Sequence, residues 1–459
     1  MRDADQQPGA EAAGPAPLVA GEEAAASGSV VLRLLGGRVP AVLEPLRIRD
    51  FALLWAGQSV SMVGDGVYTV AIAWQVYALS NSPTALAVVG IAQTLPLVAL
   101  VLVSGALADR LDRRVLMIAG AALPGIAIGV LAGLAVGGAL SLWHIWIVSA
   151  AVGAGRALAG PASGAFVPDI VPAGLLLEAN SLAQLVRPLA MTLVGPALGG
   201  VLVAAIGTGS CFAVDAASFA AAVGTLLAIP SRPHARGEPT ALLTEIREGF
   251  AFIRRHVWIW GTLGMATIWV LLIMGPLDVL VPYIVKNDLG GSARDLGLVF
   301  ASGGVGAIAA AAVTGQRGLP ARPLTWMLAG WGLACATIAG VALAASSWQA
   351  AVALLAFQAL LTVSEIIWIT LLQRFVPGRL LGRVRSLDWL LSVGLVPISF
   401  ALTGPIAGAL GARTTLAGAG LVASAIAVGT LLLPGMRDAE AELAPPAARP
   451  EPRAPRRSL

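Results

Sequence analysis

Charged residues are scarce in this chain, and their scarcity excludes an ordinary soluble domain. Asp, Glu, Lys and Arg together make up 12% of the 459 residues, whereas hydrophobic residues make up 57%. A soluble domain carries roughly 25% charged residues. We therefore predict an all-α, multi-pass membrane protein whose main partner is the lipid bilayer. The formal net charge of +4 does not indicate a nucleic-acid partner, because the basic residues fall into separate short loops.

Cysteine and histidine are also rare, which excludes a disulfide framework and a metal centre. Cys211 and Cys335 lie inside apolar runs at unrelated spacing, as small buried residues do. His144, His234 and His256 are dispersed, so no cluster of metal ligands is visible. No glycine run is followed by the Lys of a phosphate-binding loop. We expect no cofactor, no catalytic residue and no enzymatic activity.

Long apolar runs dominate the chain instead. A spanning helix needs about 20 mostly apolar residues, and this measure predicts twelve spans. They cover residues 51–79, 84–106, 115–138, 143–166, 183–206 and 210–229, then 257–281, 296–314, 324–345, 348–371, 389–410 and 414–433. Two six-helix bundles follow, at residues 46–229 and 257–434.

The remaining segments are polar. Residues 1–45 and 435–459 are rich in Ala, Pro and charged residues and predict disordered cytoplasmic tails. The segment 230–256 predicts a cytoplasmic linker that ends in an amphipathic helix on the membrane surface. It joins the two predicted bundles.

Basic residues alternate between the predicted loops as the positive-inside rule requires. With the N-terminus in the cytoplasm, nearly all basic residues of the loops fall on the cytoplasmic side, and Lys286, Arg294 and Arg413 are the exceptions. We therefore predict that both termini are cytoplasmic. The scarcity of Lys beside abundant Arg, Ala and Gly indicates a GC-rich bacterial genome, and hence the bacterial cytoplasmic membrane. We expect a monomer there.

The two halves of the chain resemble each other. VPAGLLLEANSL, which begins at Val171, and VPGRLLGRVRSL, which begins at Val376, share VP, LL and SL at identical spacing. A Gly-Pro element follows each, at Gly195 and Gly404. Because each half holds an even number of predicted spans, both enter from the cytoplasm, which predicts a pseudo-twofold axis along the membrane normal. We expect a small-molecule substrate to bind between the halves.

The stretch GALADRLDRR, residues 105–114, places a cluster of charges between two apolar runs. A charge inside hydrocarbon costs about 2.5–3.5 kcal/mol on insertion scales, so the cluster marks a hairpin at the water boundary. It resembles the first cytoplasmic hairpin of the major facilitator superfamily, GxxxDRxGRR, with Asp112 in place of its second Gly. The matching residues are Gly105, Asp109, Arg110, Arg113 and Arg114.

The chain length and the stretch FALLWAGQSVSMVGDGVYTVAIAW, from Phe51, resemble the twelve-helix exporters of that superfamily, which include macrolide and siderophore efflux proteins. The resemblance implies that Asp109 meets the cytoplasmic end of the eleventh helix and closes an inner gate, while Arg113 and Arg114 hold neighbouring charges. Attraction of negative charge to a helix N-terminus supplies the physical basis. Topological anchoring by positive charge alone is the alternative.

GPALGG in the fifth span is similar to the motif that antiporters of this superfamily carry. Its residues are Gly195, Pro196, Gly199 and Gly200. Glycines spaced by four are also common wherever transmembrane helices pack closely. Antiporter function and plain packing both stay open for this motif.

Coupling to protons, or to another ion, needs an ionisable group inside the membrane. Asp65, in the middle of the first span, is the first candidate, and Glu365 is the second. Asp215 and Asp278 rank lower because we expect them near the outer ends of their spans, within reach of water. Arg156 would be costly if unpaired, so we expect it to pair with Asp65. A carboxylate held by helix packing that never titrates is the alternative for each acid.

A further set of polar and aromatic residues lies within the spans. The candidates for lining a substrate cavity are Gln58, Trp74, Gln93, Trp269 and Trp368. Tryptophans are also enriched at membrane boundaries, so a boundary position is the alternative for each of them. A mostly apolar cavity with few polar groups favours a hydrophobic or amphipathic small molecule.

These features favour a secondary active transporter that exports a drug-, macrolide- or siderophore-like compound in exchange for protons by alternating access. An importer or facilitator of a small metabolite with the same fold is the alternative. A non-transporting membrane sensor would need a ligand-reading domain, and a membrane enzyme would need a convergent nucleophile and base. Neither is visible in the sequence.

The two hypotheses for Asp109 predict different outcomes for Asp109→Glu, which keeps the charge. If Asp109 only contributes to topology, transport by this variant stays at the wild-type rate. If Asp109 closes a gate, the longer side chain disturbs the contact, and we expect the initial rate of transport to fall severalfold at unchanged expression. Initial rates in inverted vesicles, normalised to protein content, distinguish the two.

Overall fold

Runs rich in Leu, Ala, Val and Gly form helices in this protein because a helix pairs its own backbone N–H and C=O groups, which lipid cannot do. The computed structural model describes residues 41–108, 111–231, 242–437 and 440. In the first half its elements are the 3-10 helix η1 (Ala41–Arg47), α2 (Arg49–Leu79), α3 (Pro83–Ala108), α4 (Arg113–Val136), α5 (Leu142–Ile170), the 3-10 turn η2 (Ala173–Leu175), α6 (Leu176–Pro188), the π-helix η3 (Leu189–Val194) and α7 (Gly195–Leu227).

The second half is helical as well, and α8 lies within the predicted linker. Its elements are α8 (Leu242–Arg255), α9 (Val257–Tyr283), the π-helix η4 (Ile284–Asp288), α10 (Ala293–Arg317), α11 (Pro323–Leu343), α12 (Ser347–Phe375), α13 (Gly378–Gly394), α14 (Val396–Leu410) and α15 (Ala412–Thr430).

Ten helical stretches in the described residues are long and apolar enough to cross a membrane, judged by length and composition. One of them, Leu176–Leu227, is 52 residues long. It is broken at Gly207, whose φ of 80° and ψ of 168° are not helical and are tolerated because glycine lacks a Cβ. The helix α2, 31 residues long, is not among the ten. The predicted number of twelve spans therefore stays a prediction.

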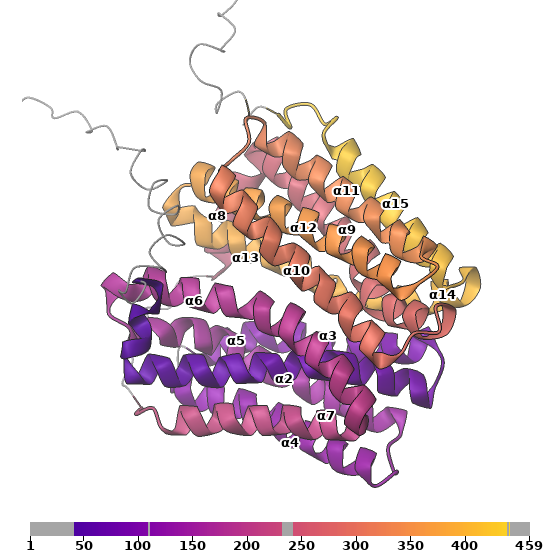
Figure 1. Ribbon diagram of the computed structural model, residues 1–459. Helices are drawn as coiled ribbons and strands as arrows, with labels where there is room; N and C mark the ends of the chain where they lie inside the picture. The colour runs from indigo at the N-terminus through magenta and orange to yellow at the C-terminus, as the bar shows by residue number, and fades with distance from the viewer. Residues whose placement is uncertain (1–40, 109–110, 232–241, 438–439, 441–459) are drawn as a thin grey trace, which may run out of the picture. The chain divides into compact units, whose positions relative to one another are not determined.

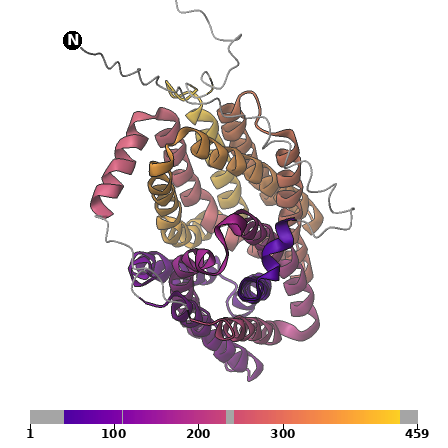
Figure 2. The same cartoon turned by 90° about the vertical axis from the view of Figure 1, so that its left-hand side faces the viewer.

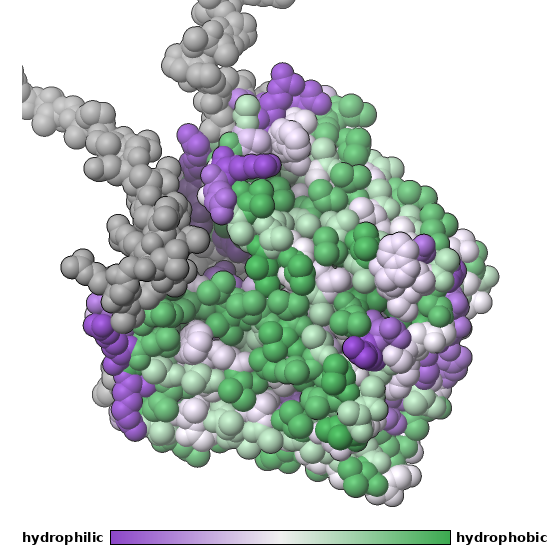
Figure 3. Space-filling model, viewed as in Figure 1, coloured by the Kyte–Doolittle hydropathy of each residue, from purple (hydrophilic) through white to green (hydrophobic). Residues whose placement is uncertain are grey.

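Large apolar side chains cover much of the surface of these helices. Ile126, Val136 and Leu343 are at least 70% exposed, and Figure 3 shows hydrophobic residues over the visible sides of the helices. Hydrophilic residues gather toward the left and right edges of that view. An apolar surface of this extent matches a lipid environment and not water.

The helices form two groups, as Figure 1 shows with the earlier helices below and the later ones above. In the first group α2 and α4 pack on α7, and α3 and α4 pack on α5. In the second group α9 packs on α14 and α15, while α12 packs on α10 and α11. Figure 2 shows the same separation after a 90° turn. The groups meet where α7 contacts α10, α3 contacts α14 and α2 contacts α9.

Glycines allow two of these helix contacts. A Cβ on Gly66 of α2 would lie 2.7 Å from the Cα of Gly195 on α7. A Cβ on Gly200 of α7 would lie 2.9 Å from the Cα of Gly297 on α10, in the other group. Gly199 also faces α2. The GPALGG motif therefore packs on helices of both groups. Close packing was one of the two roles that the sequence suggested for this motif, and an antiporter function was the other.

The fifth and eleventh predicted spans differ from the helices that contain them. Helix begins at Leu176 instead of residue 183, and it passes through the π-helix η3 before α7. Likewise α13 begins at Gly378 instead of residue 389, and it ends at Gly394 just before α14. Polar residues end an apolar run in the sequence, whereas a helix continues through them. In both halves the regular α-helix is thus interrupted before the Gly-Pro element. The interruption is the π-helix η3 directly before Gly195 in the first half, and Leu395, ahead of Gly404, in the second.

The described residues also extend into a segment that the sequence assigned to the N-terminal tail. The helix η1 covers residues 41–45 of that tail. Val42 and Leu46 pack against a core cluster that includes Phe51 and Leu54. This apolar contact accounts for a helix where composition predicted disorder.

We expect the variant Gly66→Ala to be less stable than the wild type, because its new methyl group would lie within 3 Å of α7. Overpacking of this kind costs about 1–3 kcal/mol. The midpoint of thermal unfolding in detergent should fall. Gly133→Ala is the matched control, since a Cβ there would meet no atom within 4 Å. Equal midpoints for the two variants would contradict the close approach of α2 and α7.

Candidate functional site

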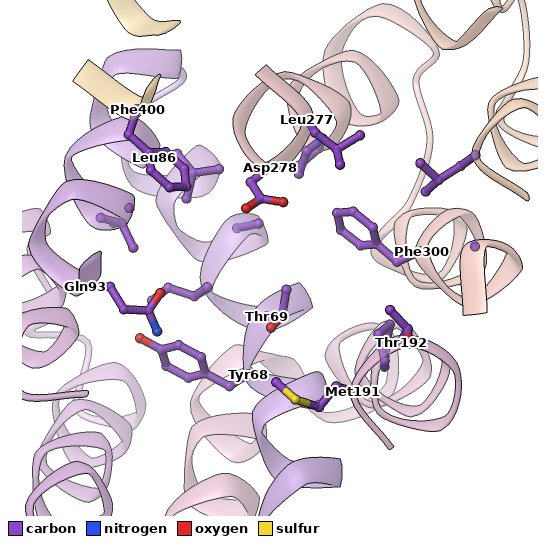
Figure 4. Close-up of a pocket in the computed structure, with 18 of the residues that line it drawn as sticks. Tyr68, Thr69, Leu86, Gln93, Met191, Thr192, Leu277, Asp278, Phe300 and Phe400 are labelled. Carbon is purple, nitrogen blue, oxygen red and sulfur yellow. The ribbon is translucent and has the colours of Figure 1, made fainter. Parts of the chain in front are cut away.

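Helices of both groups surround a cavity of about 330 Å³. Its walls come from α2, α3, α5, η3 and α7 on one side and from α9, α10, α12 and α14 on the other. Figure 4 shows side chains from several of these helices pointing into it. The volume is at the lower end of the range for small-molecule sites. The cavity lies between the two halves of the chain, where the repeats predicted a substrate site.

The predicted pair of Arg156 and Asp65 is present at this cavity. Nη2 of Arg156, on α5, lies 2.9 Å from Oδ1 of Asp65, on α2. Arg156 also lines the cavity. The Asp65 side chain is 14% exposed and that of Arg156 is 36% exposed. Each charge therefore compensates the other at a site where both would otherwise be costly.

Asp215, on α7, is fully buried, so the expectation that it reaches water is wrong. Its Oδ1 accepts a hydrogen bond of 3.2 Å from the Ser218 hydroxyl, which also donates to the Asp215 carbonyl at 2.7 Å. Its Oδ2 has no hydrogen-bond partner within the part of the chain that the structure describes. Gly64 of α2, next to Asp65, packs against this carboxylate and Ser218. The tight contact between α2 and α7 excludes water here.

Asp278, on α9, is exposed, and its carboxylate points into the cavity (Figure 4). The expected access to water is therefore present, but on the cavity wall. Leu277 and Phe300 lie beside it in Figure 4. The structure thus places two of the four candidate carboxylates near one cavity, Asp65 through its pair with Arg156 and Asp278 directly.

Glu365, on α12, is exposed and does not line the cavity. A separate polar cluster lies close by on the second group of helices. Trp368 donates a hydrogen bond of 3.3 Å to Oδ2 of Asp388, which also lies 3.5 Å from Nη1 of Arg385. The structure therefore does not bring Glu365 together with Asp65.

The two glutamine candidates occupy different positions. Gln93, on α3, lines the cavity, and Figure 4 shows its side chain near the Tyr68 hydroxyl. Gln58 donates a hydrogen bond of 2.7 Å from Nε2 to the Ser163 hydroxyl, which joins α2 to α5 away from the cavity. Of this pair, only Gln93 is placed to contact a ligand.

The three tryptophan candidates do not line the cavity. Nζ of Lys286 lies 5.0 Å from the centre of the Trp74 ring, a cation–π contact between the two groups of helices. Trp269 is partly buried against the core. Trp368 is 5% exposed and packs edge-on against Trp258. These rings serve in packing and in the contact between the groups.

The charged hairpin is described in part. Gly105 lies in α3, whereas Asp109 and Arg110 lie outside the described residues. Arg113, at the start of α4, lies 2.8 Å from Oδ2 of Asp169 on α5 and donates to the Ala165 carbonyl at 2.9 Å. It thus holds a neighbouring acid, in the manner that the resemblance implied.

Arg114 contacts the end of a different helix. Its Nε and Nη2 donate to the carbonyls of Leu226 and Leu227, each at 2.8 Å. The last carbonyls of a helix lack intrahelical partners and carry partial negative charge. Asp112, at the N-cap of α4, accepts a hydrogen bond from the Arg114 backbone N–H at 2.8 Å. Arg114 therefore joins α4 to the end of α7.

Sequence reasoning missed the tyrosines. Tyr68 lines the cavity. The Tyr77 hydroxyl donates a hydrogen bond of 2.7 Å to the Val279 carbonyl on α9, and its ring packs edge-on against Tyr283. These are the three tyrosines of the chain, and all lie where the two groups meet. Their rarity within apolar spans was a signal that could have identified them.

Comparison with known proteins identifies the family. A family described as transmembrane secretion effector matches residues 41–455, which is most of the chain. This chain belongs to the major facilitator superfamily. The fold is similar to that of a bacterial homologue of the iron transporter ferroportin, in a crystal structure of its inward-facing state, with a TM-score of 0.62 at 17% identity. That match covers 83% of this chain and 98% of the other.

Two relatives of this superfamily member are efflux proteins. Macrolide efflux protein A of Streptococcus pyogenes is 26% identical over 259 residues, which cover 55% of this chain and 64% of that protein. The match thus spans less than two thirds of that relative. Multidrug efflux pump Tap of Mycobacterium tuberculosis is 27% identical over 411 residues, which cover 86% of this chain and 96% of that protein. The chain is therefore similar to efflux-type transporters.

We expect Asp65→Ala to lower the midpoint of thermal unfolding, because it leaves Arg156 without its partner. Loss of one member of a buried pair costs about 3–5 kcal/mol, and the partial exposure of Arg156 reduces this to roughly 1–3 kcal/mol. The double variant Asp65→Ala/Arg156→Ala should regain part of the loss. Additive losses in this double-mutant cycle would show that the two side chains do not interact.

Proposed function

We propose that this protein is a secondary active transporter that exports hydrophobic or amphipathic small molecules in exchange for protons. We also infer its architecture, twelve spans in two six-helix bundles, from the helices described above. Ten stretches qualify by length and composition, α2 has the length of a further span, and the break at Gly207 divides Leu176–Leu227 into two. The binding site is the cavity between the bundles, which opens alternately to the two sides of the membrane.

The nature of the cavity wall supports the substrate class. Apolar side chains such as Leu86, Phe300 and Phe400 form much of it, with few polar groups between them. Two relatives are named for efflux of macrolides and of multiple drugs. A wall of this kind binds apolar surface and uses a few polar contacts for orientation.

The ion pair of Arg156 and Asp65 at the cavity is the observation that carries the coupling. A proton on Asp65 would remove its charge and weaken its attraction to Arg156. Because the two residues lie on α2 and α5, loss of the pair changes how these helices are held together. Asp215 lies directly behind α2 as a second, buried carboxylate. Protonation therefore biases the equilibrium between the two orientations of the cavity.

The described contacts between the bundles represent one of these orientations. Tyr77 bonds to Val279 and Gly200 approaches Gly297 near the end of the bundle where α2 ends and α10 begins. With both termini in the cytoplasm, as the loop charges favour, this end faces the outside of a bacterial cytoplasmic membrane. The cavity of a monomer would then release its substrate when these contacts open.

We expect Asp65→Asn to abolish transport driven by a pH gradient, because an amide cannot take up and release the proton. The substitution keeps the size of the side chain and a hydrogen bond to Arg156, so expression should be normal. The measurement is accumulation of a fluorescent lipophilic dye in inverted vesicles after an imposed pH gradient.

Asp295→Asn is the matched control, because Asp295 caps the start of α10 away from the cavity. Its transport should match that of the wild type. Undiminished transport by Asp65→Asn would remove Asp65 from the coupling mechanism. Transport that follows a sodium gradient instead of the pH gradient would identify Na⁺, and not the proton, as the coupling ion.

A further inference from the structure

We propose that the cavity selects substrates with a single positive charge, and that the Asp278 carboxylate recognises this charge. The inference rests on the proposed function, since it takes the cavity as the transport site. It assigns Asp278 to substrate recognition instead of coupling, and it narrows the substrate class from hydrophobic molecules in general to hydrophobic cations.

The first support is the position of Asp278. Its carboxylate points into the cavity from α9 (Figure 4). One turn earlier, the Gly275 backbone N–H donates a hydrogen bond of 2.8 Å to the Ser399 hydroxyl, and Ser399 lies on α14. A Cβ on Gly275 would lie 2.6 Å from the Ser399 carbonyl oxygen. This contact fixes α9 against α14 and thus holds Asp278 in place.

The second support is the balance of charge at the cavity. Among the residues that the structure describes, Arg156 is the one basic residue that lines the cavity, and Asp65 compensates its charge at 2.9 Å. Lys286 lies over the Trp74 ring and makes no ion pair with Asp278. Within the described part of the chain, Asp278 has no ion pair, and its carboxylate accepts no hydrogen bond. The cavity therefore carries one negative charge that none of the described residues compensates.

The third support is the character of the neighbouring wall. The other polar side chains at the cavity are neutral, among them Thr69, Gln93 and Gln358. Phe300 lines the same cavity as Asp278, and Figure 4 shows both side chains pointing into it. A carboxylate in a mostly apolar cavity attracts a cation more strongly than one in bulk water, and the face of an aromatic ring in the wall adds to that attraction. An anion of the same size is repelled.

A pair of ions with matched size and shape tests this inference. Tetraphenylphosphonium and tetraphenylborate both carry four phenyl groups and differ in the sign of their charge. We expect the purified protein in nanodiscs to bind the cation at least about fivefold more tightly than the anion, which corresponds to one partly exposed ion pair. Equilibrium binding at constant pH, without any ion gradient, measures this ratio.

Variants then test the residue. Asp278→Asn should reduce affinity for the cation about fivefold and raise affinity for the anion, because the repelling charge is gone, whereas Asp278→Glu should retain the preference. Asp295→Asn is the matched control, because it removes a carboxylate away from the cavity and should leave the ratio of the two affinities unchanged. If Asp278→Asn does not yield folded protein, the affinities of the wild type and of Asp278→Glu for the two ions still test whether the cavity prefers the cation.

Equal affinity of the wild type for both ions, or an unchanged ratio in Asp278→Asn, overturns the inference. These measurements do not depend on transport. Proton-driven transport without a preference for the cation would contradict this inference alone. A preference for the cation without transport in vesicles would contradict the proposed function and leave the site intact.

Discussion

The ion pair of Arg156 and Asp65 joins α2 and α5 at the cavity wall, and much of the site depends on it. A charge inside a membrane has to meet an opposite charge or water. Here both conditions hold, because the two side chains compensate each other and are partly exposed. The pair also determines the charge of the cavity, since it leaves Asp278 as the carboxylate without a described partner. The proton coupling that we propose and the substrate recognition that we infer thus belong to different acids, Asp65 and Asp278.

Close helix packing provides the rigid frame for these charges. In lipid the hydrophobic effect does not drive helices together, so small residues that let backbones approach carry much of the association. Gly66 and Gly195 bring α2 against α7, and Gly200 brings α7 against α10 of the other group. One short motif therefore links the helix that carries Asp65 to the opposite half of the chain. A change in the ion pair can reach the contact between the halves along this route.

Several features of the site could be predicted from the sequence. The pairing of Arg156 with Asp65 followed from the cost of an unpaired arginine, and the location of the cavity between the halves followed from the internal repeat. Other features could not. Asp215 and Asp278 each lie near one end of a predicted span, yet one is fully buried and the other faces the cavity. Hydropathy along a chain reports depth in the membrane, whereas the side of the helix that meets a neighbour depends on packing.

The sequence by itself determined that the chain forms membrane helices in two similar halves, because hydropathy, the positions of charges and the internal repeat are all properties of the linear chain. Only the tertiary structure decided which charges meet, which tyrosines join the halves, and which cavity carboxylate has no partner among the described residues. Those outcomes depend on distances between helices far apart in the sequence, such as α2 and α9. Close glycine contacts help to set the distances between neighbouring helices. The pattern of residues along the sequence does not say which helices become neighbours.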